Sequence, residues 1–280
     1  TGWSCQWYVD RFTDGGEDPA LCKLFFFDDA GPPWARKDPA SEGRWNRWNV
    51  TSKTWEVLEE DPPKPFGLYA GIGATRLSSR AESAIRSLYR DVAATKETEK
   101  EALNVESGLA EEIVFGNLDR SRLELPMLLS GACDGADETF GEMASKHEHQ
   151  LVHFLGPGDE KYASAKAKDS QRDAFEYVDN ELLMGEVVAK AFDKAAESRV
   201  LGRERTSDWK AKVSEMASRR NFLQVRRADA VYVVGWRLEK GKDQFTGRND
   251  CPPHETPVLD VGGGTGWACQ WYVDRFADGA

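Results

Sequence analysis

Residues 66–76 read FGLYAGIGATR, and this stretch decides the fold class. A short apolar run ends in closely spaced glycines, and the residues that follow, 78–93, read SSRAESAIRSLYRDVA, which has the pattern of a helix. A strand that leads through a glycine turn into a helix is the repeating unit of a parallel α/β sheet. Ser79 and Glu82 have the spacing of a capping box, so the helix is predicted to begin there and to run to about Leu103.

The same alternation continues on both sides of this stretch. Apolar runs predict further strands, which span residues 21–29, 127–131, 151–156, 230–235 and 256–261. Helical patterns lie between or beside them, over residues 3–12, about 106–116, from about 137, through 159–225 and from the glycines at 262–266. Strands that alternate with helices predict a doubly wound, mostly parallel sheet, and the highly charged residues 159–215 are interpreted as a helical insertion.

One segment does not fit this alternation. Residues 30–65 are rich in tryptophan, proline and charge, and they are predicted to be an ordered connection that closes in a proline linker. Tryptophans in a flexible linker would expose a large apolar area. Those of this segment are therefore expected to pack against the domain that they cross.

The two ends of the sequence are nearly the same. Residues 1–16 and 265–280 differ only at Ser4/Ala268, Thr13/Ala277 and Gly16/Ala280, so thirteen of the sixteen positions are identical. This predicts a tandem repeat with a period of 264 residues, in which each repeat is a whole domain. Neighbouring repeats are then the expected protein partners, and assembly into a filament, sheet or shell is one expected role.

Composition narrows the functional classes. The formal net charge of −11 argues against a protein that coats nucleic acid, since that task needs a basic surface. No apolar run reaches the length that spans a bilayer, so no membrane partner is expected. The five cysteines include no C-x-x-C pair, which favours buried reduced thiols and a reducing environment inside a cell or organelle.

Three glycine-bearing turns carry the functional prediction. AGIGATR (70–76), SGACDGAD (130–137) and VGGGTGWA (261–268) each follow a predicted strand and precede a predicted helix. Glycine lets backbone amides approach an anion, and the N-terminus of a helix carries partial positive charge. In a parallel sheet such turns share the carboxyl edge, where ligands of open α/β folds bind. A phosphate-bearing ligand is therefore predicted, and the alternative is that the turns are merely tight connections.

These motifs resemble the SLOG superfamily of Rossmann-like domains. The resemblance rests on GIGATR, SGACDGAD, ASRRNFLQV, ADAVYVVG and GGGTGWA, and it is strongest for phage-type members that share Arg220, Asn221, Gln224 and Val225. It implies that residues 66–280 are the main body of a nucleotide-binding domain and that residues 1–60 are the closing helix, strand and tail of such a domain. The repeat boundary would then lie inside a domain, and residues 1–60 either complete a neighbouring repeat or swap into this one.

The resemblance also bears on catalysis. Phosphoribohydrolases of the superfamily carry an Arg in M-x-x-R-K and a Glu that closes G-G-x-G-T-x-x-E. Met216, Arg219 and Arg220 match the first motif, but Gln270 stands at the position of the Glu. An amide cannot transfer a proton or stabilise an oxocarbenium ion as a carboxylate does. Binding without hydrolysis is therefore expected, with a nucleotide N-glycosidase as the remaining enzymatic alternative, and no catalytic residue is assigned.

The predicted ligand contacts come from the turns and from the arginine-bearing helix. They are Gly71, Gly73, Thr75, Arg76, Ser130, Gly131, Asp134, Asp137, Arg219, Arg220, Asn221, Gly262, Gly263, Gly264, Thr265 and Gly266. Several of them have an alternative interpretation. In it, Asp137 caps the helix that follows it, and the arginines are solvated surface charges.

Two further groups of side chains are not assigned to the site. His147, His149, His153 and His254 lack metal-ligand spacing and are interpreted as surface or strand-end residues. The aromatic stripe of Trp267, Trp271, Tyr272 and Phe276 is interpreted as core or repeat-to-repeat packing.

Overall fold

A computed structural model describes residues 21–29, 43–90, 109–156, 173–177, 219–237, 261 and 263–276 of the chain. Within these residues, eight strands form one sheet in the order β3-β2-β1-β8-β4-β5-β6-β7. The strands are β1 (Leu24–Asp28), β2 (Trp45–Asn49), β3 (Thr54–Val57), β4 (Leu68–Gly73), β5 (Met127–Ser130), β6 (Gln150–Leu155), β7 (Asp173–Tyr177) and β8 (Ala230–Gly235). The helices are α2 (Ser79–Ser87), α3 (Leu109–Phe115), η2 (Arg120–Arg122), α4 (Ala136–Lys146) and α8 (Gly263–Asp274), and residues 219–226 are also helical.

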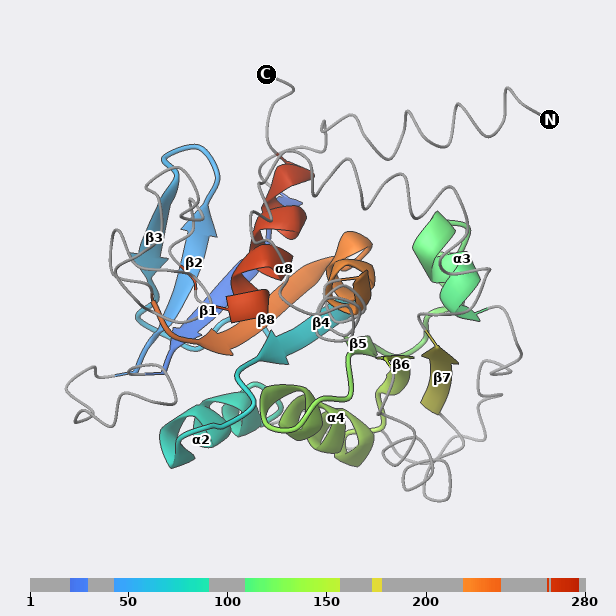
Figure 1. The fold of residues 1–280 in the computed structure, drawn as a ribbon, viewed down its shortest axis with the longest axis horizontal. Helices are drawn as coiled ribbons and strands as arrows, with labels where there is room; N and C mark the ends of the chain where they lie inside the picture. Colours follow the sequence, from blue (N-terminus) through green and yellow to red (C-terminus); the bar gives the residue numbers. More distant parts are fainter. Residues whose placement is uncertain are drawn as a thin grey trace, which may run out of the picture.

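The sheet is mostly parallel, and the predicted α/β class is confirmed. Strands β1, β8, β4, β5, β6 and β7 pair in parallel, whereas β2 and β3 continue the sheet as an antiparallel hairpin beyond β1. Figure 1 shows the strands as a twisted layer with helices on both sides. Strand β1, the first described strand of the chain, lies inside the sheet between β2 and β8, and β8 in turn separates it from β4.

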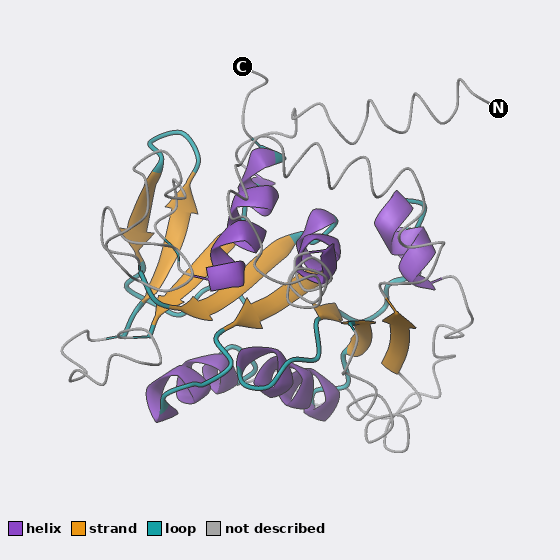
Figure 2. Cartoon of the chain, in the orientation of Figure 1, coloured by secondary structure: helices purple, strands orange, loops and turns teal. Residues whose placement is uncertain are grey.

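Two hydrophobic clusters fill the spaces between the sheet and its helices. Helices α2 and α4 cover one face, and α8, α3 and the helix of residues 219–226 cover the other (Figure 2). Strand β1 shows how the sequence serves both clusters, because Leu24 and Phe26 point to the α8 face and Phe25 and Phe27 to the α2 face. A continuous apolar run is therefore what a strand covered on both faces requires.

The interpretation of residues 30–65 as a connection is wrong where β2 and β3 form. Trp45 and Trp48 are three positions apart and are buried on opposite faces of the sheet, while Arg47 between them is exposed. Because each face of β2 buries one tryptophan, the segment lacks the alternation of apolar and polar residues that predicts a strand. The expectation that the tryptophans pack against the domain is confirmed for Trp45, Trp48 and the partly buried Trp55, whose ring centroid lies 5.1 Å from that of Trp48.

The helical prediction for residues 159–225 is wrong at residues 173–177, where β7 forms. This short strand pairs in parallel with β6, from Asp173 opposite Leu151 to Tyr177 opposite Leu155. Its five residues are too few to show a strand period among charged neighbours, so pairing with β6 determines its structure. The helix over 219–226 agrees with the prediction, and the rest of the proposed insertion lies outside the described residues.

The N-cap of helix α2 lies one residue before the Ser79 of the predicted capping box, and the helix ends sooner than predicted. Ser78 is the N-cap, and its Oγ accepts a hydrogen bond from the amide of Ala81 at 3.1 Å. Ser78 Oγ also donates to Asp29 Oδ1 at 2.5 Å, which ties the helix to the end of β1. The helix ends at Ser87, short of the predicted end near Leu103.

The final helix begins within the glycine turn, as predicted. In the predicted strand 256–261 the structure describes only Val261, which forms an isolated antiparallel bridge with Arg237. Residues 3–12 and Gly262 lie outside the described part of the chain. Among the described helices, none has the length and apolar character needed to cross a membrane.

Candidate functional site

The three glycine-bearing turns lie at one edge of the sheet. Strands β8, β4 and β5 are parallel neighbours, so the segments that follow them leave the sheet at its carboxyl edge. The turns after β4 and β5 contact each other, since the amide of Ala136 donates to Ala74 O at 3.0 Å. Val261, at the start of the third turn, bridges Arg237 just beyond the end of β8.

Several predicted ligand glycines have a role in packing. A Cβ on Gly71 would lie 2.4 Å from Phe140 Cγ, and a Cβ on Gly73 would lie 2.1 Å from Val234 O. A Cβ on Gly266 would lie 2.1 Å from Val261 O. These positions need glycine because protein atoms approach them closely. Their glycines therefore do not by themselves indicate a ligand, and their role as ligand contacts stays a prediction.

The turn after β5 contains a buried polar cluster. Gly131 N donates to Asp137 Oδ2 at 3.2 Å, and Gln224 Nε2 donates to the same oxygen at 3.5 Å. Arg220 Nη2 lies 2.7 Å from Cys133 Sγ. A Cβ on Gly131 would lie within 3.0 Å of Asp137, Arg220 and Gln224. Groups from β5, α4 and the helix of residues 219–226 thus meet at this turn.

Asp137 has a different role from the predicted helix cap. The N-cap of α4 is Gly135, with a φ of +87°, and no side chain caps this helix. Asp137 instead reaches back to the turn after β5. Burial raises the pKa of its carboxyl group to about 6, and the charge of Arg220 and hydrogen bonds from Gln224, Cys133 and Gly131 oppose that shift. The buried carboxylate therefore holds the turn after β5 in place through these hydrogen bonds.

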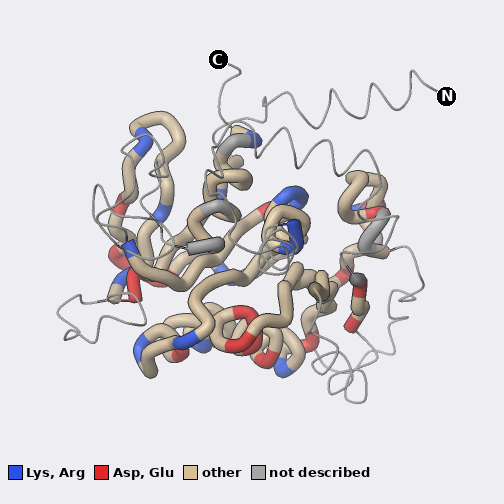
Figure 3. Tube along the Cα trace, viewed as in Figure 1, with Lys and Arg blue, Asp and Glu red and all other residues tan. Residues whose placement is uncertain are grey.

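The helix of residues 219–226 supplies the basic groups of the site. Arg220 is 9 % exposed, so it is not the solvated surface charge of the alternative interpretation. Arg219 and Asn221 are half-buried beside it. Figure 3 shows basic residues on this helical segment and on the turn that follows it. Sequence reasoning did not assign Gln224 and Cys133 to the site, although Gln224 follows Arg220 by four residues and thus shares its helix face.

The rim of the site is exposed. Thr75 and Arg76 in the turn after β4 and Asp134 in the turn after β5 are exposed to solvent, whereas Ser130 is buried. Ser130 Oγ accepts a hydrogen bond from the amide of Ala132 at 3.1 Å. At the start of α8, Gly263 and Gly264 are helical and Thr265 is half-buried. Gln270 is buried farther along the same helix.

Two histidines are buried, which corrects the interpretation of His153, inside β6, and excludes a surface position for His149, which directly precedes that strand. His149 Nδ1 lies 2.8 Å from Tyr69 Oη, and Tyr69 Oη lies 3.0 Å from Tyr89 Oη. Burial lowers the pKa of His149 to about 4. His153 Nε2 lies 3.5 Å from Asp173 Oδ2, and its ring stacks on Phe175.

The remaining histidines do not alter the site. His147 is half-buried, and His254 lies outside the described residues. The described part of the chain contains no cluster of three or more His, Cys, Asp or Glu side chains able to hold a metal ion.

Three residues of the aromatic stripe are core residues, in agreement with their interpretation as packing, and the side chain of Trp267 lies outside the described part of the structure. Trp271, Tyr272 and Phe276 are buried in the cluster on the α8 face. Phe222 meets Trp271 edge to face, with ring centroids 5.7 Å apart. These contacts fasten α8 to the helix that carries Arg220, so the two helices near the site are held together.

Comparisons with known proteins identify no relative. No protein-family model matches the sequence, and neither the curated proteins nor the solved structures contain a match. The resemblance to the SLOG superfamily therefore stays a prediction that rests on the quoted motifs.

Proposed function

We propose that the carboxyl edge of the sheet binds the phosphate of a nucleotide or of a phosphorylated nucleotide derivative. One observation carries this proposal. Thr75, Arg76 and Asp134 are exposed in two touching turns, and their backbone amides donate no hydrogen bond within the described part of the chain. Successive amides of this kind form an anion-binding concavity when they point in one direction.

Charge supports the same conclusion. The Arg76 side chain is exposed on the turn after β4, and the Arg220 guanidinium lies behind the turn after β5. A phosphate between these turns would meet positive charge from both sides, in a protein whose net charge is −11. Hydrogen bonds between charged groups are stronger than those between neutral groups.

The proposed role is binding without hydrolysis. Gln270 is buried in α8, and its side chain carries no acid or base for breaking an N-glycosidic bond. If the domain nevertheless cleaves nucleotides, incubation with nucleoside monophosphates will release free base. We expect no release.

The binding proposal is tested by titrating the protein with nucleoside monophosphates in a calorimeter and by measuring the melting temperature at each concentration. We expect the phosphorylated compounds to bind and to raise the melting temperature, and the parent nucleosides to bind far more weakly. Equal binding of a nucleoside and its monophosphate would contradict a phosphate site. No heat and no thermal shift with any nucleotide at millimolar concentration would also contradict it.

A matched pair of variants locates the site. Arg76→Gln removes an exposed charge before α2, at the carboxyl edge, and Arg90→Gln removes an exposed charge just after the same helix. We expect Arg76→Gln to weaken nucleotide binding by about tenfold, the value of one charge-assisted hydrogen bond. Arg90→Gln should change the affinity by less than about twofold, because surface charges beyond a Debye length are screened. Equal effects of the two variants would indicate non-specific attraction.

A further inference from the structure

Helix α8 lies where a crossover helix between β8 and β1 would lie. Strands β8 and β1 are parallel neighbours, from Ala230–Gly235 and Leu24–Asp28, and α8 packs against both of them. Parallel neighbours are normally joined by a helix that crosses one face of the sheet. In this chain the crossover helix and its second strand are present, although β1 precedes β8 in the sequence.

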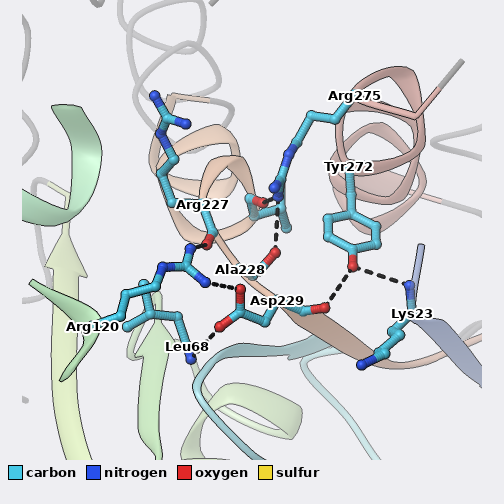
Figure 4. A network of polar contacts seen from close by, with 9 residues as sticks. Lys23, Leu68, Arg120, Arg227, Ala228, Asp229, Tyr272 and Arg275 are labelled. Atoms are coloured by element: carbon cyan, nitrogen blue, oxygen red, sulfur yellow. Dashed lines mark hydrogen bonds and ion pairs between the residues drawn. The ribbon is translucent and has the colours of Figure 1, made fainter. Parts of the chain in front are cut away.

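The end of α8 contacts the beginning of β1. Lys23 N donates to Tyr272 Oη at 3.1 Å, and the Tyr272 hydroxyl donates to Asp229 O at 3.0 Å. Cys22, Tyr272 and Phe276 belong to the same buried cluster. Figure 4 shows Tyr272 between Asp229, just before β8, and Lys23, just before β1. A connection from α8 into β1 would therefore begin and end at neighbouring points.

The sequence contains such a connection. Residues 265–276 repeat residues 1–12 except at Ala268, and in the first copy eleven residues, 13–23, separate Phe12 from β1. If Ala280 were joined to Glu17, eleven residues would likewise separate Phe276 from Leu24, namely 277–280 and 17–23. Eleven extended residues span up to about 36 Å, which is ample for neighbouring points.

We propose that strands β1, β2 and β3 form an exchangeable unit, and that the surface made by β8 and α8 accepts this unit from a second copy of the chain. Residues 58–67 link this unit to β4. The repeat makes α8 and β1 successive elements of one folding unit, so their pairing does not depend on that link. A unit from a second copy presents the same groups to β8 and α8.

Contacts between the unit and the main body define what a second copy would reproduce. Phe26 pairs with Val233 in the sheet register, and Asp29 accepts from Ser78 N at 3.1 Å. The link itself is rich in proline, and Tyr232 Oη donates to Pro63 O within it at 2.8 Å. The link takes no part in the pairing of β1 with β8, so the same contacts form whichever copy supplies the unit. This inference uses no ligand and stands apart from the proposed phosphate site.

Complementation between two full-length variants tests the exchange. Phe26→Asp places a charge in the buried part of β1 and damages the unit, whereas Val233→Asp damages the main body at β8. Each variant alone is expected to lose cooperative unfolding. When the two are unfolded, mixed and refolded together, the intact body of the first and the intact unit of the second should form a folded sheet. Near-UV circular dichroism of the tryptophans and sedimentation at twice the chain mass are the readouts.

The control pair combines Phe26→Asp with Trp48→Asp, which both damage the unit and should not rescue each other. A mixture of Phe26→Asp and Val233→Asp that gives only the sum of the separate signals would overturn the proposal. So would equal rescue by the control pair.

A permuted chain is the second measurement. It runs from residue 66 to 280 and continues with residues 17–65, so that α8 leads directly into β1 and residues 1–16 are absent. We expect it to unfold cooperatively, as a monomer, within a few degrees of the parent melting temperature. A permuted chain that does not fold would show that the repeat does not encode the α8 to β1 connection, and the proposal would be lost.

Discussion

The two edges of the central sheet use their polar groups differently. At the amino edge, Asp229 accepts from Leu68 N at 2.9 Å and from Arg120, and Arg275 donates to Ala228 O at 2.8 Å (Figure 4). At the carboxyl edge, the turns after β4 and β5 expose Thr75, Arg76 and Asp134. The polar groups named at the amino edge bind one another, whereas these three residues of the carboxyl edge face solvent above the buried cluster at the turn after β5. Substitutions of the paired groups at the amino edge should therefore affect stability, and substitutions of the exposed residues at the carboxyl edge should affect binding.

The largest expected effect comes from a pair of aspartates, one at each edge. Asp229→Ala removes an acceptor of Leu68 N and Arg120, and we expect it to lower the free energy of unfolding by about 3 kcal/mol, since hydrogen bonds to charged groups contribute about 1.5–3 kcal/mol each. Asp134→Ala, at an exposed position, should change it by less than about 0.5 kcal/mol. Urea unfolding of the two variants measures both values. Similar losses would remove the distinction between the edges.

The next effect is the acid sensitivity of the amino edge. His149 precedes β6 and has a pKa of about 4 in the folded protein, below the usual 6.5 of the unfolded chain. As the pH is lowered, the unfolded chain therefore binds a proton at His149 before the folded protein does. The contribution of His149 to the free energy of unfolding falls by about 2 kcal/mol between pH 8 and pH 5. In the variant His149→Asn, the free energy of unfolding should therefore fall less than in the parent between pH 8 and pH 5. Parallel profiles for the variant and the parent would contradict this role.

A titration of the opposite sign is expected at the carboxyl edge. The pKa of Asp137 is raised from 3.8 to about 6, so the folded protein binds the proton first. Its contribution to stability is present below pH 3.8 and is lost as the pH rises through 6, by about 1 kcal/mol between pH 5 and pH 8. Relative to the parent, Asp137→Asn should therefore gain stability over that interval. A constant difference between the two proteins across the interval would contradict the raised pKa.

The last prediction concerns the alkylation rates of the cysteines, which are measured in the folded protein. Burial raises the pKa of Cys22 to about 12 and also raises that of Cys269, whereas the half-buried Cys133 lies beside Arg220. Among the described cysteines, we expect iodoacetamide to label Cys133 at least about tenfold faster than the other two, because the thiolate is the reactive form. Peptide mapping by mass spectrometry measures the rates. Arg220→Met should slow the labelling of Cys133, and an unchanged rate would mean that the guanidinium does not support the thiolate.

Sequence patterns predicted the strands that are apolar throughout and failed where pairing alone makes a strand. Residues 230–235 form β8 at the predicted limits, because AVYVVG is buried on both faces. Strand β2 was missed because Trp45 and Trp48 serve opposite faces, and β7 was missed because a short strand beside charged residues shows no period. The cap of α2 moved to Ser78 because Asp29, from the end of β1, receives a hydrogen bond from the same hydroxyl.

The amino-acid sequence alone is enough to predict the alternation of strand, glycine turn and helix, and with it the placement of the turns at one edge of a parallel sheet. It also contains the near-identity of residues 1–16 and 265–280, which predicts a tandem repeat independently of any fold. The packing of the folded chain shows which glycines are required, as at Gly71 against Phe140, and which groups meet at the turn after β5. Gln224 and Asp137 are 87 residues apart, and their contact depends on two helices on opposite faces of the sheet reaching the same edge. Local patterns report burial and periodicity along the chain, whereas such contacts form only when distant elements pack together.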